Sequence, residues 1–343
     1  MAIHCHKRLR SPSPLPSLFS KRYKTVSPSV FEEVKFFIIS DTHDAELSKF
    51  PECDVVLHCG DLTEDGSPES ICSALQMLGN VKAELKLAIA GNHEISLDKD
   101  YYLSEGGSEA THERARSLVY GPNSEAAKQG VTFLDEGMHE FTLKSGATFR
   151  IYASPWTPKH GASAFQYPTS EDRYNEGILT SQWAKNVGTE TSRIPDNVDS
   201  VMTHGPPQYV LDTTEDGHSA GCSHLRRAIS RVQPRLHCFG HIHCGYGAQR
   251  LNFHAVPSPK MKDPNDDSAD AIIRLAKEWF GVNQAKKKGY GVLRPISGDT
   301  FKKRKQTMMV NAAVMDSEDE PGNPPFLVYL DLPVPKASQG TEC

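Results

Sequence analysis

Short apolar runs rich in β-branched residues recur along the chain, and segments with helical spacing of apolar residues lie between them. Runs of this kind predict buried strands. We predict strands at residues 36–39, 55–57, 85–90, 149–153, 198–202, 236–239 and 326–332. Helices are predicted at 67–78 and 221–232, and the first begins with Ser67 as N-cap and Pro68 in its first turn. This alternation is typical of a layered α/β protein.

Five of the predicted strands are followed by residues of the types that bind metal ions. These blocks are Asp41-Thr42-His43, Gly60-Asp61, Gly91-Asn92-His93-Glu94, Thr203-His204-Gly205 and Gly240-His241-Ile242-His243. Their position indicates loops at the C-terminal ends of buried strands. Asp, Asn and His side chains without thiolates suit Mn²⁺, Fe, Zn²⁺ or Mg²⁺. The pattern therefore predicts a site for divalent metal ions.

The first two blocks supply the ligands that a pair of neighbouring ions requires. Asp41 and His43 lie two residues apart and can reach one ion from the same side of a turn. Asp61 can bridge this ion to a second one through its two carboxylate oxygens. Two catalytic ions held about 3.5 to 4 Å apart need such a bridge. We therefore predict a centre of two metal ions.

The remaining blocks complete the predicted centre. Asn92 offers a neutral oxygen to the second ion and leaves the next residue, His93, pointing toward the substrate. His204, together with His241 and His243, completes the two ligand shells. A single block of this kind is more often a turn or a packed histidine, but five blocks in this order favour a site.

The ordered blocks resemble the calcineurin-like metallophosphoesterase superfamily, whose pattern is D-x-H, G-D, G-N-H-[ED], a lone His and G-H-x-H. The stretches AGNHE (90–94), ASPWTP (153–158), MTHGPP (202–207) and LHCFGHIHCGYG (236–247) are similar to the smaller family of metallophosphoesterase-domain-containing proteins. The resemblance implies two β-sheets packed face to face and flanked by helices. It also implies that His241 joins Asn92 and His204 on the second ion, and that His243 joins Asp41 and His43 on the first.

Two ions at such a site would activate a water or hydroxide held between them and would also bind phosphoryl oxygens. Hydrolysis of a phosphate ester is the predicted reaction. His93 is the predicted general acid, which donates a proton to the leaving oxygen as imidazolium. Either Glu64 or Asp65 could hold its ring. His58 is predicted to be a packed core residue, with support of the site from behind as the alternative.

The substrate class follows from two missing arginines. Protein Ser/Thr phosphatases of the superfamily carry G-D-x-V-D-R-G and R-G-N-H-E, whose arginines hold a phosphate dianion. This chain has neither arginine, as in the class III cyclic-nucleotide phosphodiesterases. We therefore predict a phosphodiesterase for small, including cyclic, nucleotides, with Asn92 and Trp156 contacting the substrate. Loop packing is the alternative for Trp156, and a phosphomonoesterase or a low-activity metal-binding scaffold is the alternative function.

Composition narrows the setting without changing this prediction. The chain has 343 residues, a net charge of −5 and no apolar run long enough to span a bilayer. We therefore expect a small phosphoester as the partner, with neither a membrane nor a nucleic-acid polymer. Eight cysteines without a C-x-x-C pair favour a reduced compartment, which we take as the cytoplasm, with the nucleus as a further location. The oligomeric state is not predicted.

The domain organisation is predicted from composition along the chain. Residues 1–30 form a disordered basic Ser/Pro-rich tail, for which an organellar presequence is the alternative. The metallophosphoesterase domain spans 34–333 with an insert at about 258–304, and 334–343 form a C-terminal tail. The insert contains a predicted helix at 268–280. Its basic clusters at 286–288 and 302–305 are predicted loop charges, or alternatively a nuclear-import signal or a phosphate-attracting rim. The acidic segment 316–325 is predicted to be a loop.

Overall fold

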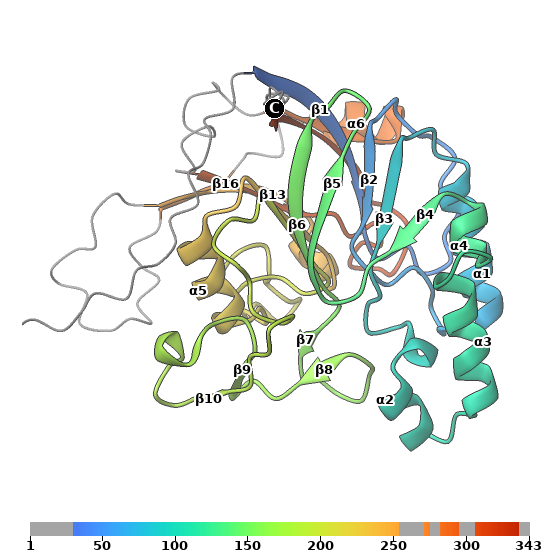
Figure 1. The fold of residues 1–343 in the computed structure, drawn as a ribbon, viewed down its shortest axis with the longest axis vertical. Helices are drawn as coiled ribbons and strands as arrows, with labels where there is room; N and C mark the ends of the chain where they lie inside the picture. Colours follow the sequence, from blue (N-terminus) through green and yellow to red (C-terminus); the bar gives the residue numbers. More distant parts are fainter. Residues whose placement is uncertain (1–29, 254–270, 275–281, 295–305, 336–343) are drawn as a thin grey trace, which may run out of the picture.

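A computed structural model describes residues 30–253, 271–274, 282–294 and 306–335. Within these residues, two large β-sheets share one apolar core, and helices cover their outer faces (Figure 1). The predicted fold class, two packed sheets flanked by helices, is confirmed.

The first sheet has six strands in the order β15-β17-β1-β2-β3-β4. Strands β1 to β4 run parallel to one another, and β17 pairs antiparallel with β1. Their bounds are β1 Val30–Ile39, β2 Val55–His58, β3 Leu85–Ala88, β4 Val131–Phe133, β15 Gly291–Leu293 and β17 Phe326–Val334. The parallel strands bring the C-terminal ends of β1, β2 and β3 to one edge of the sheet.

The second sheet has seven strands in the order β14-β13-β16-β12-β11-β6-β5. Strands β6, β11, β12 and β16 are parallel, whereas β5, β13 and β14 pair antiparallel at the two sides. Their bounds are β5 Gly137–Thr142, β6 Thr148–Ser154, β11 Ser200–Thr203, β12 Leu236–Phe239, β13 Gly247–Asn252, β14 Ala271–Arg274 and β16 Gln306–Asn311. Every predicted strand is therefore present.

Helices flank the sheets, with α1, α3 and α4 beyond the first sheet and α5 beyond the second (Figure 1). The predicted helix at 67–78 is confirmed as α1. Its predicted N-cap is confirmed too, because the Ser67 side chain accepts a hydrogen bond from the amide of Ser70 at 3.2 Å. The prediction at 221–232 is confirmed as α5. The helices are α1 Pro68–Gly79, α2 Lys99–Ser104, α3 Glu109–Val119, α4 Glu125–Lys128, α5 Ser223–Val232 and α6 Val282–Lys288. Short 3₁₀ turns lie at η1 Ile95–Leu97, η2 Gly177–Leu179 and η3 His243–Gly245, and short strands at β7 Thr157–Pro158, β8 Gln166–Tyr167, β9 Glu171–Asp172 and β10 Lys185–Asn186.

Strand β1 explains why the predicted strands are apolar on both faces. Phe36 and Ile38 point toward the second sheet, where the Phe36 ring meets Phe149 edge-on at 5.5 Å between centroids. Phe37 and Ile39 point the other way and pack beneath the helices. All four β1 side chains are fully buried. A strand between two apolar layers cannot alternate with polar residues, so its sequence reads as a continuous apolar run.

Two predictions within the insert are wrong where the structure describes it. Residues 271–274, which we predicted as part of a helix, form β14 and pair antiparallel with β13. The β-branched Ile272 and Ile273 favour a strand, and the edge of β13 offers the hydrogen-bonding partner. Residues 286–288 lie on α6 instead of a loop, although their side chains are exposed as expected. The rest of the predicted helix and the cluster at 302–305 lie outside the described residues.

Other predictions on organisation have different outcomes. The segment 316–325 is a loop, as predicted. Residues 1–29 and 336–343 lie outside the described residues, and the domain boundaries stay predictions. None of the helices in the described ranges is both long and apolar enough to cross a membrane. The six cysteines among the described residues are free thiols, and four of them are buried.

Candidate metal centre

The predicted metal ligands meet where the two sheets present the C-terminal ends of their parallel strands. The loops after β1, β2 and β3 carry the first five site residues, and those after β11 and β12 carry the last three. Backbone hydrogen bonds join these loops, from Asp41 to Gly60 at 3.0 Å and from Gly240 to His204 at 2.9 Å. Such a crevice beyond strand ends is the usual place for a ligand in an α/β fold.

One group of ligand atoms contains Asp41, His43 and His243, whose donor atoms all lie within 4.8 Å of one another. His243 Nε2 lies 3.6 Å from Asp41 Oδ1, and the rings of His43 and His243 are 5.3 Å apart. The Nε2 atom of His43 is buried and has no hydrogen-bond partner among the residues that the structure describes. A buried nitrogen without a partner costs stability unless a cation or proton donor meets it, so this group fits a metal ion.

A second group contains Asp61, His204 and His241. His204 Nε2 lies 3.1 Å from Asp61 Oδ2 and 2.9 Å from Asn92 Oδ1, while its Nδ1 lies 2.9 Å from the carbonyl oxygen of Cys59. Burial alone would lower the pKa of His204, but the Asp61 carboxylate outweighs it and raises the pKa to about 9. A divalent cation that replaced the Nε2 proton would meet the imidazole, carboxylate and amide oxygens together.

Asp61 lies between the two groups, as the predicted bridge requires. Its Oδ2 atom is 3.8 Å from His43 Nε2 of the first group and 3.1 Å from His204 Nε2 of the second. Its Oδ1 atom instead accepts a hydrogen bond from the His93 amide at 2.8 Å. Asp61 is therefore the residue that both ions would share, and its bridging role stays a prediction.

His93 lies beside the first group, with its ring 4.5 Å from that of His43. Its Nδ1 atom donates to the backbone carbonyl of Glu64 at 2.7 Å. The Glu64 carboxylate is 2.7 Å from His43 Nδ1 but 3.9 Å from His93, and the Asp65 carboxylate accepts from the Ser67 amide. Of the two predicted partners, Glu64 therefore holds the His93 ring, through its backbone carbonyl and with its carboxylate at ion-pair distance, whereas Asp65 does not. The turn after Asp61 directs a carbonyl at this ring and the Glu64 side chain at its neighbour.

The protonation of His93 suits a proton donor. Burial would lower the pKa of His93, but the Asp61 carboxylate and the hydrogen bond to Glu64 outweigh burial and raise it. The side chain is 32% exposed, so its ring is reachable from solvent. Because Nδ1 is committed to Glu64, Nε2 is the nitrogen that can donate to a substrate.

Glu94 has a structural role that sequence reasoning missed. Its buried carboxylate accepts hydrogen bonds from the amides of Gly91 at 2.6 Å, Asp61 at 3.0 Å and Thr63 at 2.9 Å. Burial, followed by the charge of Asp61, raises its pKa to about 7. Glu94 thus ties the loop after β3 to the loop after β2. The sequence signal that could have indicated this role is the position of Glu94 in the G-N-H-E block.

Asp319 was also missed, and no sequence signal marked it. Its Oδ1 atom lies 3.3 Å from Nδ1 of His243, on the loop that precedes β17. A carboxylate on the outer nitrogen of a histidine fixes the orientation of the ring and strengthens its other nitrogen as a ligand. Glu64 meets His43 in the same way, so both histidines of the first group have a carboxylate partner.

The backbone of the centre is strained. Positive φ angles, which non-glycine residues seldom adopt, occur at Asp41 (51°), His43 (42°), Asp61 (49°) and His241 (67°). Each costs of the order of 1 to 3 kcal/mol and clusters of this kind mark functional sites. Glycines give the loops room: a Cβ atom on Gly91 would overlap Asp61 Oδ1, and one on Gly240 would overlap the Asp41 carboxylate. The glycines of both motifs therefore allow close approach to the two carboxylates.

Two buried histidines hold the ligand loops from behind. His58 Nε2 donates to the hydroxyl of Thr42 at 3.0 Å, because that hydroxyl donates its own hydrogen bond to the carbonyl oxygen of Leu62. His237 Nε2 donates in the same way to Thr203 at 2.9 Å. Burial lowers the pKa of His58 to about 4 and that of His237 to about 3. Both are neutral core residues, and each also orients a threonine next to a candidate ligand. His58 is therefore a packed core residue, as predicted, and it also supports the site, which was the alternative.

Trp156 is half-buried in the loop after β6. The Arg173 guanidinium lies over its ring at 4.3 Å from the centroid, and Phe165 packs against it edge-on at 5.7 Å. The Tyr174 hydroxyl donates to its carbonyl oxygen at 3.1 Å. These contacts fit the loop-packing alternative, because one ring face is already covered by Arg173. Its contact with substrate stays a prediction.

The fold and the clustered ligands define a calcineurin-type phosphoesterase. A model of the calcineurin-like phosphoesterase family matches residues 34–245, and the chain belongs to this family. That match includes all the candidate ligands and His93.

Among the relatives, the chain is 36% identical over 218 residues to a protein named probable rhamnogalacturonate lyase C from Emericella nidulans, covering 63% of this chain and 18% of that protein. It is 34% identical over 219 residues to human metallophosphoesterase domain-containing protein 1, covering 62% and 61%. It is 25% identical over 211 residues to a 3′,5′-cyclic-nucleotide phosphodiesterase from Nostoc, covering 61% and 63%. The chain thus spans less than two thirds of the length of each.

The buried neutral His237 should make stability depend on pH. The folded chain keeps this ring neutral down to pH about 3, whereas an ordinary histidine binds a proton near pH 6.5. Between these values unfolding takes up a proton, so stability falls as pH falls, by up to about 1.4 kcal/mol per pH unit. His237→Gln keeps the donor to Thr203 without titrating and should flatten the decline. We would measure urea unfolding between pH 7 and 5 in the presence of a chelator.

His139, a partly exposed histidine on β5, provides the matched control. His139→Gln measures any general effect of replacing a histidine by glutamine. If the free energy of unfolding fell equally steeply with falling pH in the unaltered chain and in His237→Gln, the result would contradict the assignment of His237 as a neutral buried ring.

Proposed function

We propose that the chain is a metal-dependent phosphoesterase that hydrolyses phosphodiester bonds of small nucleotides, including cyclic ones. The observation that carries this proposal is the position of Asp61. One of its oxygens faces histidines of both ligand groups, and the other accepts the amide hydrogen bond of His93. A single carboxylate thus links two candidate ion sites to a candidate proton donor.

The first ion would be held by Asp41, His43 and His243, and the second by His204, His241 and Asn92, with Asp61 shared between them. The buried Nε2 of His43 and the cluster of oxygen and imidazole donors fit Mn²⁺, Fe, Zn²⁺ or Mg²⁺. When bound, such ions lower the pKa of a water molecule toward neutrality and offset the charge on phosphoryl oxygens.

The role of the protein in bond cleavage falls to His93. The carbonyl of Glu64 fixes the Nδ1 proton, and the Asp61 carboxylate, against the effect of burial, raises the pKa of the ring, which favours its imidazolium form. Nε2 can then protonate the leaving oxygen as its bond to phosphorus breaks. The amide of His93 on Asp61 holds this ring in a fixed position relative to the ligand groups.

The diester preference is supported by two observations. The loops that carry Asp61 and Asn92 lack the arginines that hold a phosphate dianion in the phosphoprotein phosphatases. A relative with 25% identity is named a 3′,5′-cyclic-nucleotide phosphodiesterase. A phosphomonoesterase is the second candidate. A metal-binding scaffold is disfavoured, because it would not need the positioned His93.

Chelation of the metal ions should abolish activity, and resupply of a divalent transition metal should restore it. Asp61→Asn should lower the rate by on the order of 100-fold or more and reduce bound metal, because one side chain serves both ligand groups. Metal content by elemental mass spectrometry and turnover of a nitrophenyl diester provide the two measurements. Asp65→Asn, on the same turn, is the control. Full turnover in a verified metal-free sample, or two metals with normal turnover in Asp61→Asn, would contradict the assignment.

The diester preference should appear when the leaving group is held constant. Methyl 4-nitrophenyl phosphate should show a higher kcat/KM than 4-nitrophenyl phosphate, because no arginine clamp binds the dianion of the monoester. The shared nitrophenolate cancels the effect of leaving-group pKa. A clear preference for the monoester, or efficient release of phosphate from phosphoproteins, would favour the phosphomonoesterase.

His93→Ala should lower the rate roughly 10²- to 10⁴-fold on a diester with an alkoxide leaving group, while metal content stays unchanged. The loss should shrink markedly with a nitrophenyl leaving group, which needs little protonation. Comparing kcat on both diesters separates acid catalysis from structural damage. Equal losses on both substrates would show that His93 does not protonate the leaving group, and lost metal would make it a structural part of the centre.

A further inference from the structure

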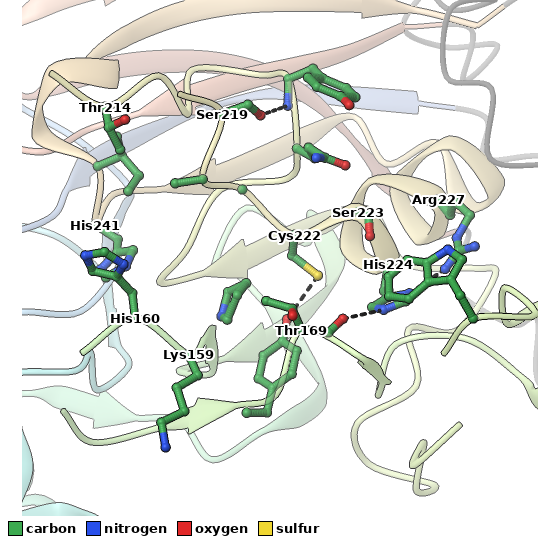
Figure 2. Close-up of a pocket in the computed structure, with 18 residues that line it drawn as sticks. Lys159, His160, Thr169, Thr214, Ser219, Cys222, Ser223, His224, Arg227 and His241 are labelled. Atoms are coloured by element: carbon green, nitrogen blue, oxygen red, sulfur yellow. Dashed lines mark hydrogen bonds between the residues drawn. The ribbon is translucent and has the colours of Figure 1, made fainter. Parts of the chain in front are cut away.

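A cavity of about 580 Å³ opens beside the second ligand group. His241 and Ile242 form one part of its wall, and the loop after β6, the segment before α5 and the first turns of α5 form the rest (Figure 2). This volume lies within the usual range for small-molecule sites, about 300 to 1,000 Å³. Figure 2 shows Lys159 and His160 on the side of the cavity where His241 lies.

The cavity and the candidate proton donor adjoin different ligand groups of the centre. Among the candidate site residues, His241 alone lines it. His93 packs against the ring of His43 and bonds to the Glu64 carbonyl instead. A phosphate held between the two ligand groups would therefore have His93 on one side and the cavity on another.

This arrangement distinguishes the two ester groups of a phosphodiester. The leaving oxygen must face His93 to receive its proton, so the cavity is available to the substituent that stays bonded to phosphorus. A monoester has no such substituent. We propose that the cavity binds the nucleoside that remains attached to phosphorus, an assignment that rests on the proposed phosphodiesterase function.

The lining of the cavity suits a nucleobase. Trp183 and Tyr209 both line the cavity, and each residue is 57% exposed. The Trp183 ring lies on His224 at 4.9 Å with an interplanar angle of 32°, which fixes one face of the indole. Its exposed surface offers a stacking platform for a base. Gln208 adds an amide that can donate to and accept from a base edge.

The test varies the retained group and keeps the leaving group. Thymidine 5′-(4-nitrophenyl) phosphate should exceed methyl 4-nitrophenyl phosphate in kcat/KM on the order of 10- to 100-fold, the usual contribution of base stacking. Trp183→Ala and Tyr209→Ala should move this ratio toward one, and Trp183→Phe should retain most of it. Ile178→Ala is the matched control, because Ile178 lies on the same loop, is 90% exposed and does not line the cavity.

A binding measurement keeps the proposal testable if neither diester is cleaved. In calorimetry with the metal-loaded chain, thymidine 5′-phosphate should bind more tightly than inorganic phosphate, and Trp183→Ala should remove the advantage. The cavity assignment would be overturned if the two diesters were hydrolysed with similar kcat/KM. It would also be overturned if Trp183→Ala and Tyr209→Ala both kept a high ratio of kcat/KM for the thymidine diester over the methyl diester. Absent hydrolysis with a retained nucleotide advantage would instead overturn the proposed function alone. Absent hydrolysis without that advantage would overturn both.

Discussion

Negative charge buried between two sheets is the constraint on which the structure depends. Asp41 and Asp61 are at most 2% exposed and repel each other, and Glu94 is buried beside them. Carboxylates so placed are costly unless donors or cations meet them. Backbone amides supply part of the compensation, since His241 donates to Asp41 at 2.9 Å and His93 donates to Asp61 at 2.8 Å. His241, whose amide meets Asp41, has a left-handed backbone, as do Asp41 and Asp61 themselves, so backbone strain and buried charge lie at the same positions.

Each ligand group combines residues from both sheets. Asp41 and His43 follow a strand of the first sheet and meet His243 from the second, whereas Asp61 of the first meets His204 and His241 of the second. The position of one sheet on the other therefore decides whether either group can form. The continuous apolar core between the sheets, which includes Phe36 against Phe149, fixes that position. Cations bound here would join the sheets and would offset the repulsion among the buried carboxylates of the first sheet.

The sequence was sufficient for features that depend on neighbours along the chain. The strands, α1, α5 and the clustering of the blocks follow from apolar runs, caps and glycines that act within a few residues. Contacts between distant loops were not predictable in this way. The carbonyl that holds His93, the Asp319 carboxylate on His243 and the three amides on Glu94 depend on how separate turns meet. Strand β14 shows the same limit, because pairing with β13 overrides helical spacing.

The wall of the cavity is built differently from the metal centre. The loop between β6 and β11 has little regular structure, and a buried carboxylate organises it instead. Asp172 is fully buried and accepts hydrogen bonds from the amides of Tyr174 and Asn175 and from the Thr180 hydroxyl. These bonds replace the ladder that a sheet would provide and hold the segment that leads to Trp183. Because no candidate metal ligand lies on this loop, its residues can change the shape of the cavity while the charge balance between the sheets stays the same.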